Sequence, residues 1–211
     1  MIDAFGLSIP ETLEEICQPS RCAVIIYDMQ VGIVPQITDG CTVLLRCQEL
    51  LTAARAKGLR VFFARHMFLP NPVAGVGQVQ RSMIWQNQMD VSMLIPLMAR
   101  GSSSWEIVPE LSPLPDEVVV DKITMSAFEG TFLNIAMRDA GLNAFIIAGI
   151  ALEVGIEPTV RQGLDLNYFP IVVRDACGSR TLELKERSIA TLTHTGEVRT
   201  VDTSDLIAAM S

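Results

Sequence analysis

Two ionisable side chains follow buried strands in the sequence and could carry out proton transfer. Asp28 comes directly after the apolar run 22–27, and Lys122 closely follows the apolar run 118–120. A carboxylate at the end of a buried strand is partly desolvated, which raises its pKa and suits it to general acid or base catalysis. A neighbouring Lys would keep this carboxylate ionised or stabilise developing negative charge. The alternatives are a helix cap for Asp28 and a surface position for Lys122.

A third candidate is the glycine-containing segment 149–159, with the sequence GIALEVGIEPT. Gly149 ends a predicted strand, and a helix is predicted to begin near residues 152–154. The backbone amides around Gly155 would then lie near a helix N-terminus, where they could bind an oxyanion or a carboxylate. The alternative is a simple turn that needs glycine for backbone freedom.

These residues belong to an alternation of short apolar runs and amphipathic stretches. Strands are predicted at 22–27, 59–64, 118–120, 144–148, 170–173 and 198–201, and helices at 43–56, 132–138, 153–166 and 182–192. This order favours right-handed crossovers and a parallel sheet covered on both faces. Ligands of such sheets bind beyond the carboxyl ends of the strands. That rule selects Asp28, Arg65, His66, Lys122, residues 150–155 and Asp175.

The length of 211 residues fits one α/β domain. We expect residues 1–20 to form an N-terminal extension and residues 21–211 to form the domain. Within it, residues 67–115 are irregular and contain both tryptophans and several prolines. Loop-rich insertions at strand ends usually form lids and pockets, so we expect this segment to contribute to the substrate pocket.

Composition excludes several classes of partner. The chain has 16 Lys and Arg against 24 Asp and Glu, a net charge of −8, and no basic run, which argues against nucleic acid and anionic membranes. No apolar stretch is long enough to span a bilayer, and residues 1–17 lack a signal-peptide pattern. The five cysteines have no C-x-x-C spacing, so we expect neither a disulfide framework nor a zinc site, and we predict a cytoplasmic protein.

Four sequence elements occur in a specific order. They are VIIYDMQ, which ends two residues after Asp28, KITMSAF from Lys122 to Phe128, GIALEVGIEPTVRQG around Gly155, and VVRDAC near the end of the fifth predicted strand. This ordered set resembles the isochorismatase-like hydrolases, or cysteine hydrolase superfamily, over residues 21–201. The resemblance implies a three-layer α/β/α fold with a mainly parallel six-stranded sheet and Rossmann-like topology. It also implies a small-molecule substrate and a homodimer or homotetramer, which the 49% apolar content favours as well.

The resemblance assigns the catalytic acid or base to Asp28 and the catalytic lysine to Lys122. Most relatives have a nucleophilic Cys where this chain has Gly155, and without a thiol no thioester can form. True isochorismatases also have Gly there and cleave a vinyl ether without a covalent intermediate. By this precedent, protonated Asp28 would donate its proton to the enolpyruvyl methylene carbon, and water would attack the oxocarbenium ion.

Further site residues are implied by the same resemblance. A cis peptide is expected at Ile150–Ala151, with the amides of Ala151 and Gly155 forming an oxyanion site. Substrate-binding residues are expected to be Gln30, His66, Gln78, Arg81, Trp85, Ser126 and Phe128. Arg81 could bind a carboxylate with two hydrogen bonds, although a solvated surface position is the commoner one for Arg.

No metal and no cofactor are expected. Metal-binding nicotinamidases of this family use an Asp-x-His after the second strand, and the corresponding stretch ARHMFLP lacks the Asp. His66 is therefore interpreted as a pocket or packing residue.

Three functions remain open at this point. The first is hydrolysis, without a thiol, of a vinyl ether of a small carboxylic acid. The second is hydrolysis of a C–N bond by water that Asp28 activates, which the amidase-like turn EVGIEPTVRQ favours. The third is ligand binding without catalysis, against which stands the presence of both Asp28 and Lys122, a costly pair to bury. Gly155 could also have been introduced by mutation, although Ala or Ser is the commoner inactivating choice.

Overall fold

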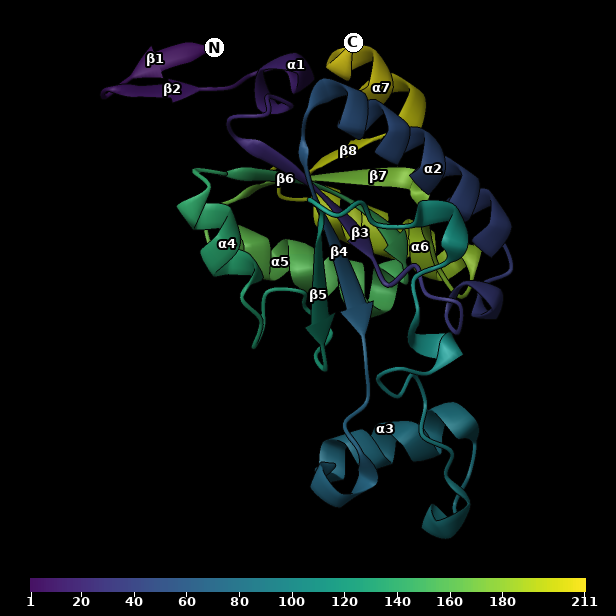
Figure 1. Cartoon of the computed structure of the whole chain (residues 1–211). Coiled ribbons are helices and arrows are strands. Elements are labelled where there is room, and N and C mark those ends of the chain that lie inside the picture. Colours follow the sequence, from purple (N-terminus) through teal and green to yellow (C-terminus); the bar gives the residue numbers. More distant parts are fainter.

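A six-stranded sheet between two layers of helices forms the centre of the protein, whose computed structural model describes residues 1–211 (Figure 1). The strands are β3 (Cys22–Tyr27), β4 (Arg60–His66), β5 (Val118–Lys122), β6 (Ala144–Ile150), β7 (Phe169–Gly178) and β8 (Arg199–Val201). They lie in the order β5-β4-β3-β6-β7-β8, and all neighbours are parallel. The predicted α/β fold with a parallel six-stranded sheet is confirmed.

The central strands are buried on both faces, which explains their continuous apolar sequences. Every residue of β3 and of β6 is buried. Successive side chains of β3 point to opposite faces: Ile25 and Tyr27 pack in one core, Val24 and Ile26 in the other.

Helices cover the two faces separately (Figure 1). The core on one face includes residues of α1 (Leu13–Ile16), α2 (Gly40–Lys57) and α7 (Thr203–Met210). The core on the other includes residues of α4 (Leu133–Asp139), α5 (Glu157–Asp165) and α6 (Leu182–Thr193).

The strand order places a crevice at the carboxyl ends of β3 and β6. The chain runs from β3 through β4 to β5 at one edge and then returns to β6 on the other side of β3. Connections that leave two adjacent strands in opposite directions open a crevice between them, where ligands of α/β proteins bind. Tyr27 and Gly149 are paired at this level, so Asp28 and Ile150 both enter the crevice region.

Residues 67–115 are less irregular than expected. They contain α3 (Val76–Gln86) and the short 3₁₀ turns η2 (Asn71–Val73), η3 (Val91–Met93), η4 (Ser103–Trp105) and η5 (Pro109–Leu111). Figure 1 shows α3 well beyond the carboxyl ends of β4 and β5, away from the sheet. Only Ser82 of α3 is buried, so the apolar residues of this helix do not follow the pattern of a core helix.

Several other boundaries differ from the expected ones. The predicted helix 153–166 is a π-helical turn, η6 (Leu152–Ile156), followed by α5. The strands β4 and β7 are longer than expected and include Arg65, His66 and Asp175. The 3₁₀ turn η1 (Val34–Gln36), helices α1 and α7, and the separate hairpin β1 (Ile2–Ala4) and β2 (Leu7–Ile9) were not predicted. None of the helices combines the length and the apolar character required to cross a membrane.

Candidate functional site

Asp28 and Lys122 form a buried ion pair at the carboxyl ends of the strands. Asp28 follows β3 with a left-handed backbone (φ 48°), and Lys122 is the last residue of β5. Their strands are separated by β4, yet Lys122 Nζ donates to Asp28 Oδ2 at 2.7 Å and to the Thr124 carbonyl at 3.3 Å. The length of the lysine side chain therefore brings together two groups that the sheet itself keeps apart.

The second oxygen of Asp28 is free. Its Oδ1 atom is buried and has no hydrogen-bond partner. Burial raises the pKa of Asp28 to about 6, although the charge of Lys122 and its hydrogen bond act in the opposite direction. Burial also lowers the pKa of Lys122 below its usual value. Asp28 can consequently exchange a proton near neutral pH.

His66 is a neutral group beside this pair. It is paired with Lys122 in the register of β4 and β5 and is almost fully buried. Burial, together with the charges of Lys122 and Arg81, lowers its pKa to about 3. Its Nε2 atom has no hydrogen-bond partner, so the ring offers an uncharged polar atom to a ligand.

A cavity of about 510 Å³ opens above these groups. Residues of the 67–115 segment, including Trp85, Leu97 and Met98, line one side of it, and the turn after β6 lines another. Its carboxyl groups come from Asp28 and Glu153, and its one lining cation is the exposed Arg180. The cavity is therefore mostly apolar, with a few convergent polar groups, as is typical of small-molecule sites.

Gly155 lies against the side chain of Tyr27. A Cβ atom at position 155 would be 2.0 Å from the Tyr27 hydroxyl oxygen and 2.4 Å from Cζ, far closer than atoms can approach. The phenol therefore takes up the space that a side chain at this position would need.

The turn around Gly155 matches the expected geometry only in part. The Ile150–Ala151 peptide bond is cis, as the resemblance implied. The expected oxyanion site needs correction, however, because the amides of Gly155 and Ile156 both point to the Ala151 carbonyl, at 3.0 and 3.2 Å. The wide π-helical turn thus uses the Gly155 amide within the backbone, although Ala151 and Gly155 both line the cavity.

Of the expected substrate-binding residues, only His66 and Trp85 line the cavity. Gln30 instead links segments of the fold, because its fully buried amide exchanges hydrogen bonds with the His66 backbone and donates to the Trp105 carbonyl. Gln78 in the same way joins α3 to Leu69 through two backbone hydrogen bonds of 2.8 Å.

Three further candidates also lie outside the cavity lining. Ser126 accepts a hydrogen bond from the Phe128 amide, and the Phe128 ring stacks on Tyr168 in the core. Arg81 is partly buried and close enough to His66 to affect its pKa, but it does not line the cavity. Polar and aromatic residues near a site are often structural, which sequence alone does not reveal.

Three lining residues that can interact with a ligand had no role of their own in the sequence-based expectations: Tyr27, Glu153 and Arg180. Tyr27 ends an apolar run and resembles an ordinary core residue. Glu153 resembles an acidic residue of a helix first turn, but its Oε1 accepts from the Arg180 amide at 3.0 Å and its Oε2 is buried without a partner. The strand-end rule included it only as part of the segment 150–155.

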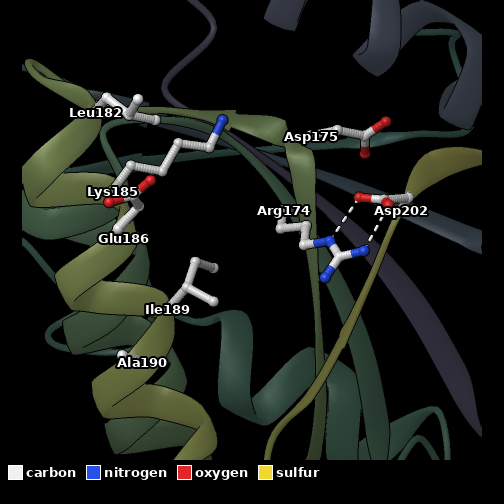
Figure 2. A pocket seen from close by; sticks show the side chains of 8 residues that line it. All are labelled: Arg174, Asp175, Leu182, Lys185, Glu186, Ile189, Ala190 and Asp202. Carbon is white, nitrogen blue, oxygen red and sulfur yellow. Dashed lines mark hydrogen bonds and ion pairs between the residues drawn. The ribbon is translucent and has the colours of Figure 1, made fainter.

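A second hollow, of about 420 Å³, lies between β7, α6 and the residue after β8 (Figure 2). Arg174 binds Asp202 through two hydrogen bonds of 2.6 Å, and Asp175 accepts two from Thr203 at the start of α7. Arg174, Asp175 and Asp202 are thus paired within the fold, and Asp175, expected at a ligand site, instead anchors α7. Nowhere does the structure bring together three His, Cys, Asp or Glu side chains as a metal site would need.

Comparisons with known protein families, sequences and solved structures agree with one another. Residues 22–203 match the isochorismatase domain family. The chain is 30% identical over 186 residues to ureidoacrylate amidohydrolase RutB of Serratia proteamaculans, covering 81% of this chain and 75% of the relative. The structure is similar to that of a cysteine hydrolase from Pseudomonas syringae pv. phaseolicola, with a TM-score of 0.78, 25% identity and 92% and 93% of the two chains covered. N-carbamoylsarcosine amidase from Thermoplasma acidophilum, at 19% identity, shares the fold with a TM-score of 0.69 over 87% of this chain and 96% of that one.

Proposed function

The chain belongs to the isochorismatase family of hydrolases, and from this premise we propose that it hydrolyses a vinyl ether of a small carboxylic acid without a thiol nucleophile. In this proposal Asp28 is the proton donor and acceptor, Lys122 holds it in place, and water is the nucleophile. The resemblance implies that Gly155 takes the position of the nucleophilic Cys, so the proposed reaction includes no covalent acyl-enzyme.

The reaction proceeds in three steps. Protonated Asp28 transfers its proton from Oδ1 to the methylene carbon of the enol ether, which leaves an oxocarbenium ion. Water adds to this cation, and its proton returns to the Asp28 carboxylate. The resulting hemiketal breaks its C–O bond to release a keto acid and an alcohol, so that one water molecule is consumed and the enzyme is regenerated.

The observation that carries this proposal is the state of the Asp28 carboxyl group. Its Oδ1 is buried without a partner beside the cavity, and its pKa of about 6 makes both the acid and the base available near neutral pH. Effective proton transfer requires such a match between the pKa and the working pH. Lys122 contributes the opposite charge that stabilises Asp28 once it has lost its proton.

Hydrolysis of a C–N bond is the second candidate, and a different observation favours it. Besides Asp28, the cavity presents two buried polar atoms without partners, Nε2 of His66 and Oε2 of Glu153. A carboxylate oxygen accepts hydrogen bonds and suits the N–H groups of an amide or ureide better than the carboxylates of a diacid. The relative in Serratia is named for an amidohydrolase activity. In this case Asp28 would act as the base that activates water.

The experiment is a pair of assays on the purified protein. One follows pyruvate release from isochorismate, and the other follows ammonia release from ureidoacrylate. Each is run with the parent, with Asp28→Asn, and with Asp121→Asn as a control, because Asp121 pairs with Arg65 and does not line the cavity. We expect pyruvate from the parent and the control, and a loss of about a thousandfold or more in Asp28→Asn.

The other outcomes decide between the candidates. Ammonia release without pyruvate would replace the vinyl-ether proposal with C–N hydrolysis. Activity that survives in Asp28→Asn would remove Asp28 from the mechanism. Absence of both products would overturn both of these reactions for this site.

A further inference from the structure

Tyr27 is an aromatic residue at the centre of the site that the proposed reaction does not use. It is the last residue of β3, directly before Asp28, and only 1% of it is exposed. Its side chain lies on the face of the sheet that α4, α5 and α6 cover. It reaches the cavity floor, where it lines the cavity together with Asp28 and Gly155.

The phenol contacts three parts of the site at once. The Nζ atom of Lys122 lies 4.3 Å from the ring centroid, in the geometry of a cation–π contact. The hydroxyl donates a hydrogen bond to the Met125 carbonyl in the segment after β5. The same hydroxyl, with the adjoining ring atoms, takes up the space next to Gly155.

Nothing in the backbone requires glycine at position 155. Gly155 is not among the glycines with a left-handed φ, so an L-residue could adopt its conformation. The three atoms closest to a Cβ there would be Oη, Cζ and Cε1 of Tyr27, at 2.0, 2.4 and 2.5 Å. A Tyr ring is rigid, and this one is held at its hydroxyl end. A side chain at position 155 and the ring of Tyr27 therefore exclude each other.

We propose that Tyr27 is a positioning and specificity-determining residue, whose phenol fills the place of a side chain at position 155 and holds Lys122 and Met125 around Asp28. The pairing of Tyr27 with Gly155 leaves Asp28 as the reactive group of the site and leaves the attack to water. The inference rests on the proposed function for what the site does, but its test needs no substrate. If the activity assays fail, the result of this test can therefore still be interpreted.

The first test is a double-mutant cycle on thermal stability. Gly155→Ala in the parent should lower Tm by about 5 °C or more, because the added methyl group must displace a rigid ring. In the Tyr27→Leu background the same substitution should lower Tm by little or nothing. Tyr27→Phe should not rescue it, because Cζ and Cε1 remain in the way.

A matched control is available in α5. A Cβ at Gly163 would meet a different aromatic ring, Phe145, at 2.6 and 2.7 Å. Gly163→Ala should therefore lower Tm equally in the parent and in Tyr27→Leu. If Gly155→Ala is tolerated in the parent, or costs the same in both backgrounds, the proposal is wrong. If Gly155→Ala alone does not fold, recovery of folded protein in the double variant supports the proposal, and no recovery overturns it.

The second test measures positioning rather than stability. The hydrogen bond of the Tyr27 hydroxyl to the Met125 carbonyl fixes the ring against which Lys122 Nζ lies. Tyr27→Phe removes this hydrogen bond and should loosen Lys122 from Asp28, which should shift the titration of Asp28 to higher pH. Infrared spectroscopy can follow the protonated carboxyl band of Asp28, assigned by difference from the Asp28→Asn variant. A residue that only fills space would leave this titration unchanged, and that result would overturn the positioning role. Because this test uses Tyr27→Phe, it still tests the positioning role of Tyr27 if Tyr27→Leu does not fold.

Discussion

The side chain of Lys122 extends past the end of β4 to Asp28, where its Nζ atom lies 2.7 Å from Oδ2. Both side chains are almost fully buried, so neither charge is compensated by water. The desolvation of such a pair is costly, and the removal of one partner costs more than the pair itself. The ion pair is therefore a feature that the fold maintains at the expense of stability, as functional groups often are.

Replacement of Lys122 by Met should reveal this cost. With the cation gone, the pKa of Asp28 should rise above its present value of about 6. The unfolded value is near 3.8, so the stability that Asp28 contributes falls as the pH rises from about 4 through the folded pKa. We expect Lys122→Met to lower the free energy of unfolding by about 3 kcal/mol at pH 8 and by less at pH 5, as measured by urea denaturation.

The double variant Asp28→Asn/Lys122→Met is the control for this prediction. It has no buried carboxylate, so its stability relative to the parent should not fall between pH 5 and pH 8 as that of Lys122→Met does. A loss in Lys122→Met that is the same at both pH values would mean that the ion pair is not its source.

His66 should make the protein sensitive to acid. Its pKa is lowered from 6.5 to about 3 by burial, so the unfolded state binds a proton that the folded state excludes. The stability it contributes is complete above pH 6.5 and is lost as the pH falls toward 3. We expect the parent to lose about 2 kcal/mol relative to His66→Gln between pH 7 and pH 5 in urea denaturation.

The other histidine is a matched control, since His194 is exposed. His194→Gln makes the same chemical change at this exposed position and controls for the replacement of a histidine by glutamine as such. If His66→Gln were as sensitive to acid as the parent, the buried neutral state of His66 would be refuted. Comparison of variants at the same pH also cancels the contribution of Asp28.

Glu153 should contribute to the chemical step if its free Oε2 orients the attacking water. Glu153→Gln keeps an acceptor for the Arg180 amide but removes the negative charge. We expect kcat to fall by about a hundredfold with a smaller change in KM, measured on whichever substrate the two assays identify. Glu157→Gln, in the first turn of α5 and paired with Arg161 at 2.7 Å, should retain activity. Equal effects of the two variants would exclude a specific role for Glu153.

Periodicity and strand-end rules were sufficient to predict the parallel sheet and the level at which the site lies. Strands buried on both faces need continuous apolar runs, which the sequence displays at β3 and β6. The same rule selected Asp28, His66 and the turn after β6, which all line the cavity. The rule also selected Asp175, which does not line the cavity. Neither the extension of β7 beyond Asp175 nor the contact of Asp175 with α7 leaves a local pattern in the sequence.

By itself, the sequence determined the order and approximate positions of the six sheet strands, which polar groups follow them, and that position 155 has no side chain, because these properties depend on local patterns. Only the tertiary structure decided which of these groups meet. The contact of Lys122 with Asp28 crosses β4, and Tyr27 fills the space beside Gly155, although each pair is separated by about a hundred residues or more in the chain. Gln30 likewise forms hydrogen bonds with the backbone of distant segments, at His66 and Trp105. Contacts between distant segments depend on packing and side-chain length, which no periodicity records.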